Sequence, residues 1–127
     1  MSKKKVLIVD DSKAMRLIVR RTLRQAGYED LEVSEACNGK EALDFLTNGS
    51  SKPDLVLSDW NMPEMTGIEL LQQLQSLEIR IKFGFITTEG TPEMRATANS
   101  AGALFLIAKP FTPESVRNAL LPVLGDS

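Results

Sequence analysis

The sequence contains no histidine, and Cys37 is its only cysteine among 127 residues. A lone cysteine excludes a disulfide within the chain and is typical of proteins from a reducing cytoplasm. A structural zinc site needs several cysteine or histidine ligands, and a Cys/His catalytic pair needs both residue types. Zinc chemistry and cysteine-based catalysis are therefore excluded as main functions.

Long hydrophobic runs are absent as well. No apolar stretch approaches the roughly 20 residues that a membrane-spanning helix needs. The basic start, Lys3-Lys4-Lys5, is not followed by a signal-peptide core, because Asp10 interrupts the apolar run. We interpret it as a solvated tail, since a formal net charge of −2 argues against nucleic-acid binding over the whole surface. We therefore expect a cytoplasmic protein without a membrane or nucleic-acid partner.

The remaining composition is that of an ordinary globular domain. Hydrophobic residues make up 43% and charged residues 25%, which argues against disorder. A chain of this length forms one domain as a rule and can bury a core without disulfides. No linker, repeat or low-complexity segment interrupts it. We expect a single domain over residues 1–127 with no fused effector domain.

Strand-like and helix-like patterns alternate five times along the chain. Short apolar runs that stop at turn or charge signals are typical of buried parallel strands. The expected strands lie near residues 5–10, 31–36, 54–59, 83–87 and 103–108, and the expected helices near 13–27, 39–48, 66–77, 92–101 and 113–121. This alternation predicts βαβ units, hence an α/β fold with a doubly wound parallel sheet covered by helices on both sides.

Several residues mark the expected helix ends. Capping side chains precede four helices, at Asn38, Thr66, Thr91 and Thr112. Gly27 is suited to end the first helix, and Pro122 is expected to end or kink the last one.

The first helix carries an apolar face and a basic face. The three-four spacing predicts that one face packs on the sheet, namely Met15, Ile18, Val19, Thr22, Leu23 and Ala26. Three arginines, Arg16, Arg20 and Arg24, are expected on the opposite, solvated side, where they could also dock an acidic partner helix.

Acidic residues end two of the apolar runs. Asp10 and Asp11 follow the first expected strand, and Asp59 ends the third. Sites in open α/β sheets lie beyond the carboxyl ends of the strands, where Thr87 and Lys109 also fall. Carboxylates gathered there repel one another unless a hard divalent cation binds them, and Mg²⁺ prefers such oxygen ligands. A carboxylate beside such an ion can attack phosphorus, with Lys109 and Thr87 placed to contact phosphoryl oxygens.

At these positions the chain resembles the receiver domain of two-component response regulators. The likeness runs from Lys5 to Leu124 and consists of separate motifs in the family's order. The motifs are Val9-Asp10-Asp11-Ser12, Met15-Arg16, Asp59-Trp60-Asn61-Met62-Pro63, Thr87 and Lys109-Pro110-Phe111-Thr112. They look most like the signature segments of the stand-alone chemotaxis (CheY-like) type.

The resemblance implies a flavodoxin-like (βα)5 fold with the sheet order 2-1-3-4-5. It implies that Asp59 accepts a phosphoryl group from a histidine kinase, a phosphotransfer protein or a small phosphodonor. Asp11, Asp59 and the backbone carbonyl of Asn61 would bind Mg²⁺ directly, and Asp10 would act largely through water. The protein would be a phosphoacceptor regulator rather than an enzyme.

The resemblance also assigns roles around the phosphoacceptor. Lys109 and Thr87 would contact the phosphoryl oxygens, and the Lys109–Pro110 peptide would be cis. Asn61 and Glu89 would tune hydrolysis, which implies a short-lived phosphoryl state. A downstream effector would bind the face formed by the fourth helix, fifth strand and fifth helix, and the protein would be a monomer or a weak dimer.

Three features depart from the family pattern. The position of the usual aromatic switch holds Leu106, with Phe105 one place earlier. Thr88 stands where a small residue is usual, so it could crowd Asp59. Gly84 interrupts the fourth strand, although glycine weakens strand interiors. Phe105 is either covered locally or part of an apolar surface patch with Leu104 or Leu106.

Other functions remain as alternatives. A degenerate receiver would serve only as a docking module. An aspartate-nucleophile phosphatase would need a second Asp where the chain has Asn61, and a flavin-binding module would need a Gly-rich phosphate loop after the first strand.

Overall fold

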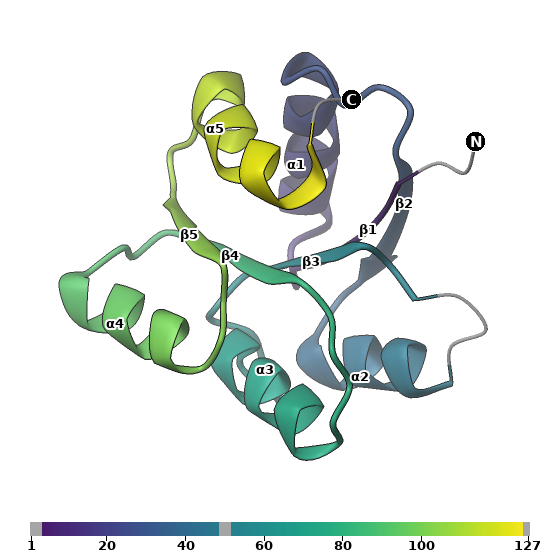
Figure 1. The fold of residues 1–127 in the computed structure, drawn as a ribbon, viewed down its shortest axis with the longest axis vertical. Coiled ribbons are helices and arrows are strands. Elements are labelled where there is room, and N and C mark those ends of the chain that lie inside the picture. Colours follow the sequence, from purple (N-terminus) through teal and green to yellow (C-terminus); the bar gives the residue numbers. More distant parts are fainter. Residues whose placement is uncertain (1–3, 49–51, 126–127) are drawn as a thin grey trace.

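Five parallel strands form a central sheet, and helices cover both of its faces (Figure 1). This computed structural model describes residues 4–48 and 52–125. The strands are β1 (Lys5–Val9), β2 (Glu32–Ala36), β3 (Leu55–Ser58), β4 (Phe83–Thr87) and β5 (Phe105–Ala108). The helices are α1 (Lys13–Gln25), α2 (Gly39–Thr47), α3 (Gly67–Ser76), α4 (Pro92–Ser100) and α5 (Pro113–Leu124).

The topology agrees with the expectation. The strand order is β2-β1-β3-β4-β5, and each neighbouring pair is parallel. Helices α1 and α5 lie on one face, while α2, α3 and α4 lie on the other (Figure 1). The α/β class, the doubly wound sheet and its order are therefore confirmed. No helix in the described part of the chain is long and apolar enough to cross a membrane.

Two hydrophobic cores lie on opposite faces of the sheet, because side chains alternate along each strand. The core beneath α1 and α5 includes Val6, Ile8, Leu55, Leu57, Ile86 and Ile107. The core facing α2, α3 and α4 includes Leu7, Val9, Val56, Phe83, Phe85 and Leu106. Burial on both faces explains why the strands are continuous apolar runs rather than alternating ones.

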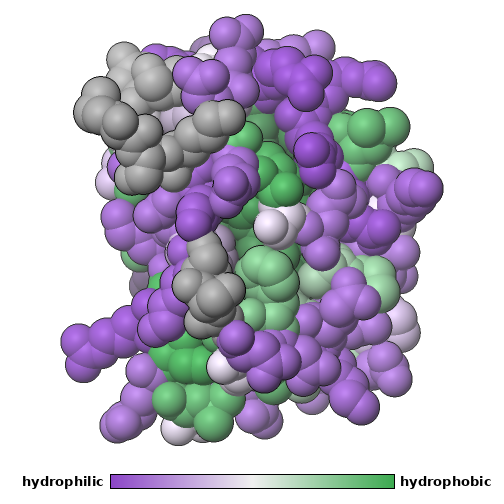
Figure 2. Space-filling view, turned by 90° about the vertical axis from the view of Figure 1, so that its right-hand side faces the viewer, coloured by the Kyte–Doolittle hydropathy of each residue, from purple (hydrophilic) through white to green (hydrophobic). Residues whose placement is uncertain are grey.

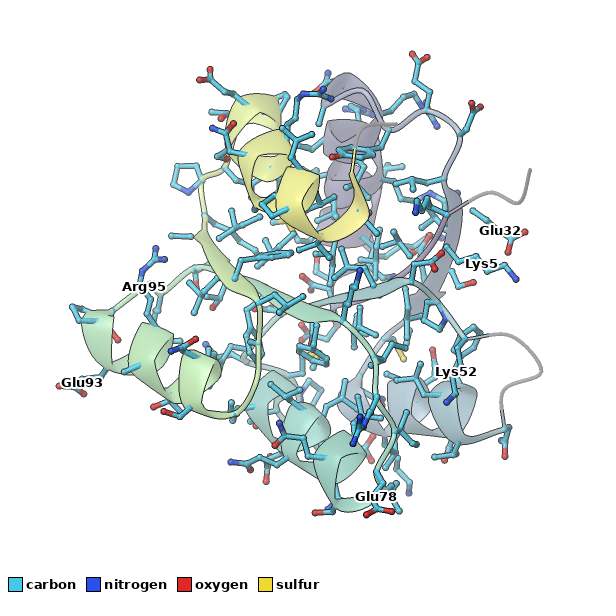
Figure 3. All side chains as sticks on the ribbon, viewed as in Figure 1. Lys5, Glu32, Lys52, Glu78, Glu93 and Arg95 are labelled. Carbon is cyan, nitrogen blue, oxygen red and sulfur yellow. The ribbon has the colours of Figure 1, made fainter. Side chains whose placement is uncertain are left out.

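Strand β2 forms one edge of the sheet and carries charge there. Glu32 and Glu35 are exposed, and the Lys5 ammonium lies 3.8 Å from a Glu32 carboxylate oxygen (Figure 3). Figure 2 shows this side of the molecule as largely hydrophilic, with hydrophobic residues at the upper right, near the middle and at the lower left. Charges on an edge strand discourage pairing with another chain. Of the basic start, Lys3 lies outside the described residues.

Gly84 in β4 is explained by Phe105 in β5. The two residues are register partners on neighbouring strands. A Cβ atom at Gly84 would overlap the Phe105 ring, so the ring lies directly across the glycine. The ring packs with the core beneath α1 and α5, whereas Leu106 is buried in the opposite core. Phe105 is thus partly covered and does not join Leu106 in a surface patch, while a patch with Leu104, which is 53% exposed, stays a prediction.

The predicted helix caps are present, with one difference. Thr66 forms a full capping box with Glu69, and Thr91 and Thr112 each cap a helix that begins with proline. The Asn38 side chain accepts a hydrogen bond from the Glu41 N–H, but the Glu41 carboxylate binds the Cys37 N–H at 3.0 Å. In a full capping box the Glu41 carboxylate would accept from the N–H of Asn38, but here it accepts from the N–H of the residue before it.

Two expectations about helix α1 are wrong. Ile18 is 44% exposed, because it lies beside the buried stripe through Val19 and Leu23 rather than within it. Arg16 does not lie in solvent, since its side chain is only 14% exposed. Its guanidinium reaches the Asp10 carbonyl, directly after β1, and the Glu35 carboxylate on β2, as described below.

Helix α5 also runs further than expected. It continues through Pro122 to Leu124, so Pro122 does not end it. Packing opposes the loss of one backbone hydrogen bond: Leu124 is buried, and the Lys82 ammonium donates to the Val123 carbonyl at 2.9 Å. Tertiary contacts here outweigh the local preference of proline.

Candidate functional site

The polar strand ends predicted from the sequence meet at one edge of the sheet. Val9 in β1 is the register partner of Ser58 in β3, so the residues that follow, Asp10 and Asp59, are neighbours. The Asp59 N–H donates to the Val9 carbonyl at 2.8 Å, which extends this pairing past the strands. On the other side, the Lys109 N–H donates to the Thr87 carbonyl at 2.7 Å.

Three carboxylates and one ammonium form the centre of the site. Each of Asp10, Asp11 and Asp59 offers an oxygen within 4.8 Å of the others. The Lys109 ammonium lies 3.5 Å from Asp10 and 3.8 Å from Asp59, and these three side chains are at most 12% exposed. Asp11 is exposed to solvent. One lysine leaves an excess of negative charge, and this donor set fits Mg²⁺, which prefers carboxylate oxygens and retains waters.

The carboxylate of Asp59 is held in a fixed orientation. Its Oδ1 accepts a hydrogen bond from the Trp60 N–H at 2.7 Å, while its Oδ2 faces Lys109. Burial raises the pKa of Asp59, and the nearby charges of Asp10 and Asp11 add to that effect, although Lys109 and the Trp60 N–H oppose it. A bound cation would favour the ionised form of this carboxyl.

The backbone around Asp59 depends on a glycine that the sequence reasoning did not assign to the site. The Gly67 N–H donates to the Trp60 carbonyl at 2.8 Å, and a Cβ atom at Gly67 would collide with the Asp59 carbonyl oxygen. The Ser58 hydroxyl donates to the same Asp59 carbonyl at 2.8 Å. Because Gly67 has no side chain, the start of α3 can pack directly against the backbone of Asp59. The signal in the sequence is glycine at the first helical position, directly after the Thr66 cap.

Arg16, which was expected in solvent, instead contacts the loop that carries the acidic residues. Its Nη1 donates to the Asp10 carbonyl at 2.6 Å, and its Nε donates to Glu35 at 2.7 Å. Arg20 binds the other Glu35 oxygen at 2.8 Å. Although burial raises it, the pKa of Glu35 is lowered overall, because both arginines donate hydrogen bonds to its carboxylate. Arg16 thus connects the loop that carries Asp10 and Asp11 to strand β2.

Thr87 is buried at the end of β4, and its hydroxyl oxygen accepts a long hydrogen bond from the Glu89 N–H at 3.4 Å. Thr88 and Glu89 are exposed, as is Asn61 in the loop after Asp59.

The Lys109–Pro110 peptide is cis, as expected. Leu106 is 8% exposed and packs into the core beside α4.

Comparison with known proteins gives the same picture over nearly the whole chain. A family model described as the response regulator receiver domain matches residues 6–121. The chain is 43% identical to the chemotaxis protein CheY1 of Helicobacter pylori over 124 residues, which are 95% of this chain and 97% of that protein. It is 35% identical to the sporulation initiation phosphotransferase F of Bacillus subtilis, covering 94% of this chain and 93% of the relative.

Solved structures agree with these sequence matches. The Vibrio cholerae chemotaxis protein CheY4 superposes with a TM-score of 0.80 at 38% identity, over 97% of this chain and 100% of that chain. The structure described as FixJ-N superposes with a TM-score of 0.80 at 31% identity, over 94% of this chain and 92% of that chain. The fold, the acids at the strand ends and these relatives together show that the chain belongs to the response regulator receiver domain family, the family of two-component signalling, and that it is similar to the CheY chemotaxis proteins.

Proposed function

We propose that Asp59 accepts a phosphoryl group from a histidine kinase or a phosphotransfer protein, and that the modified domain then binds a downstream protein. The observation that carries this proposal is the setting of the Asp59 carboxylate. It lies at the carboxyl edge of the sheet, oriented by the Trp60 N–H and flanked by Lys109 and two further acids. An acid at this place caps no helix, because α3 begins at Gly67 and its cap is Thr66.

The transfer is a displacement at phosphorus. An oxygen of the ionised Asp59 carboxylate forms a bond to phosphorus, and the P–N bond of the phosphohistidine donor breaks. The electron pair of that bond returns to the imidazole nitrogen, and Asp59 becomes an acyl phosphate. The Lys109 ammonium, 3.8 Å from Asp59, then binds a phosphoryl oxygen and balances part of its charge. The Thr87 hydroxyl donates to a second phosphoryl oxygen.

The acidic cluster fits Mg²⁺ as the resident ion. Asp11, Asp59 and the backbone carbonyl of Asn61 would hold it, with Asp10 acting through water. When bound, Mg²⁺ neutralises charge on the carboxylates and on the incoming phosphoryl group. The ordered hydrogen bond from the Ser12 N–H to Asp10, at 2.9 Å, keeps this carboxylate directed to the site.

The phosphoryl group is removed by hydrolysis. Asn61 and Glu89 are exposed beside the site, on the loops after β3 and β4. A water oxygen attacks phosphorus, phosphate leaves, and the Asp59 carboxylate is restored. We propose that the exposed polar side chains at these two positions admit water and keep the phosphoryl state short-lived. The protein acts here on itself and is a regulator rather than an enzyme with a separate substrate.

The output is a change in partner binding at the surface formed by α4, β5 and α5. Residues 88–91 join Thr87 to α4, so an event at Thr87 reaches this surface through only a few residues. Leu104 is 53% exposed beside β5 and gives the surface an apolar contact. We propose that the domain works as a single receiver, as a monomer or weak dimer.

Intact-mass measurement with acetyl phosphate tests the proposal. The protein should gain one phosphoryl group in the presence of Mg²⁺ and none after chelation of the metal. Asp59→Asn should abolish labelling, whereas Asp44→Asn, which changes an exposed acid on α2, should leave it intact. Stoichiometric labelling of Asp59→Asn would refute the assignment. Absence of labelling in the unaltered protein would favour a degenerate receiver that only docks.

A further inference from the structure

The side chain of Arg95 joins three parts of the molecule. Arg95 lies in the first turns of α4. Its Nη1 donates to the Leu106 carbonyl of β5 at 3.0 Å, and its Nε donates to the Gly90 carbonyl at 3.3 Å. In Figure 3 the side chain rises from α4 on the side of β5 and α5, while Glu93 points away. One guanidinium therefore ties α4 and the loop after β4 to strand β5.

The loop passes close beneath this guanidinium. A Cβ atom added at Gly90 would lie 3.1 Å from the Arg95 Nη2 and 3.0 Å from the Ala108 Cβ. Both distances are tighter than ordinary carbon contacts. Glycine thus lets the loop run between Arg95 and β5, and a displaced loop cannot keep the same contacts.

The same loop begins at the proposed phosphoryl site. Thr87 accepts from the Glu89 N–H at 3.4 Å, and Gly90 follows directly. When the Thr87 hydroxyl turns to a phosphoryl oxygen, the Glu89 N–H loses this acceptor and the loop is freed to move. The Arg95–Gly90 bond is already longer than the usual 2.7–3.2 Å, so a small displacement of the carbonyl breaks it.

Leu106 has no polar group in its side chain that could report such a movement. It is packed into the core facing α4, and only its carbonyl takes part in the contact with Arg95. Arg95 makes hydrogen bonds both to this loop and to β5, whereas the Leu106 side chain borders Gly90 with apolar atoms alone. Its hydrogen bonds have a charged donor, which makes them stronger than bonds between neutral groups.

We propose that Arg95 is a positioning residue that holds the loop of residues 88–90 in its resting conformation and is released when Asp59 is phosphorylated. This proposal rests on the proposed function of Asp59. Release separates the Arg95 Nε from the Gly90 carbonyl, so the surface shown to a partner changes in the placement of its charge as well as in shape. By thermodynamic reciprocity, a variant that lacks the resting contacts accepts the phosphoryl group more readily.

The first test is the equilibrium affinity for beryllofluoride, a stable mimic of the phosphoryl group, in the presence of Mg²⁺. Arg95→Ala should bind beryllofluoride about 5-fold more tightly than the unaltered protein, at the low end of typical coupling between sites. Arg95→Lys, which can reach only one carbonyl at a time, should lie between the two. Arg24→Ala, which removes an exposed arginine of α1 on the other face, should leave the affinity unchanged.

The second test is amide hydrogen exchange with and without beryllofluoride, a stable mimic of the phosphoryl group. In the unaltered protein, exchange in residues 88–95 should rise on activation. In Arg95→Ala it should already be high at rest and change little. An unchanged or weaker affinity for beryllofluoride, or a full activation response in Arg95→Ala, would overturn the role of Arg95. Failure of the unaltered protein both to bind beryllofluoride and to be labelled by acetyl phosphate would instead refute the phosphoacceptor proposal itself.

Discussion

The packing of Phe105 across Gly84 predicts that these two positions are energetically coupled. The residues are register partners in β5 and β4, and a Cβ atom at Gly84 would overlap the ring. In Gly84→Ala the ring must leave its half-buried position or the strands must shift. Forcing extra volume into a packed core costs about 1–3 kcal/mol. We therefore expect Gly84→Ala to lower the free energy of unfolding by about 2 kcal/mol.

Removal of the ring should reverse the sign of this effect. In a Phe105→Ala background, the space above residue 84 is open. Alanine in place of glycine then stabilises by about 0.5–1 kcal/mol, because the unfolded chain loses conformational freedom. The difference between the two backgrounds gives a coupling energy of about 2.5–3 kcal/mol, which is large for a pair of neighbouring residues.

Urea unfolding of the unaltered protein, the two single variants and the double variant measures this coupling, provided that their m-values agree. Phe45→Ala serves as a control, because Phe45 is an exposed ring on the distant helix α2. Combined with Gly84→Ala, it should give additive changes. If Gly84→Ala costs the same with and without the Phe105 ring, overlap with that ring is not the reason for glycine in β4.

Two further predictions concern the acidic site. Burial raises the pKa of Asp59 in the folded protein, so without metal the folded state gains stability as pH falls toward the usual carboxyl range and loses it as pH rises. Asp59→Asn should therefore raise the melting temperature at neutral pH. A lower melting temperature would contradict this sign. Arg16→Ala should weaken Mg²⁺ binding about 10-fold, measured by Trp60 fluorescence, because it removes the hydrogen bond to the Asp10 carbonyl. Arg20→Ala removes a hydrogen bond to Glu35 instead and should weaken Mg²⁺ binding less. Equal effects of the two variants would refute the reasoning.

Much of the site could be predicted because its components are local in the sequence. Asp10, Asp59, Thr87 and Lys109 each follow a short apolar run, and the carboxyl ends of parallel strands must meet at one edge of the sheet. The helix caps are equally local, since a capping hydroxyl binds an N–H only a few residues away. Such features follow from residue type and spacing alone.

Other features depend on which elements become neighbours in space. Arg16 was expected in solvent because helical spacing places it opposite the apolar stripe, yet its long side chain reaches one acceptor directly after β1 and another on β2. Pro122 was expected to end α5, yet burial of Leu124 extends the helix. Helical periodicity describes where a side chain leaves the helix and carries no information about what lies within its reach.

By itself, the sequence determined the order of strands and helices, the caps, and the polar residue at each strand end, because these depend on residues a few positions apart. Only the tertiary structure decided that Phe105 covers Gly84, that Arg16 holds the Asp10 loop, and that Arg95 spans from α4 to β5. These contacts join residues of different elements, and their geometry depends on strand register and helix packing, which no local pattern of residues specifies.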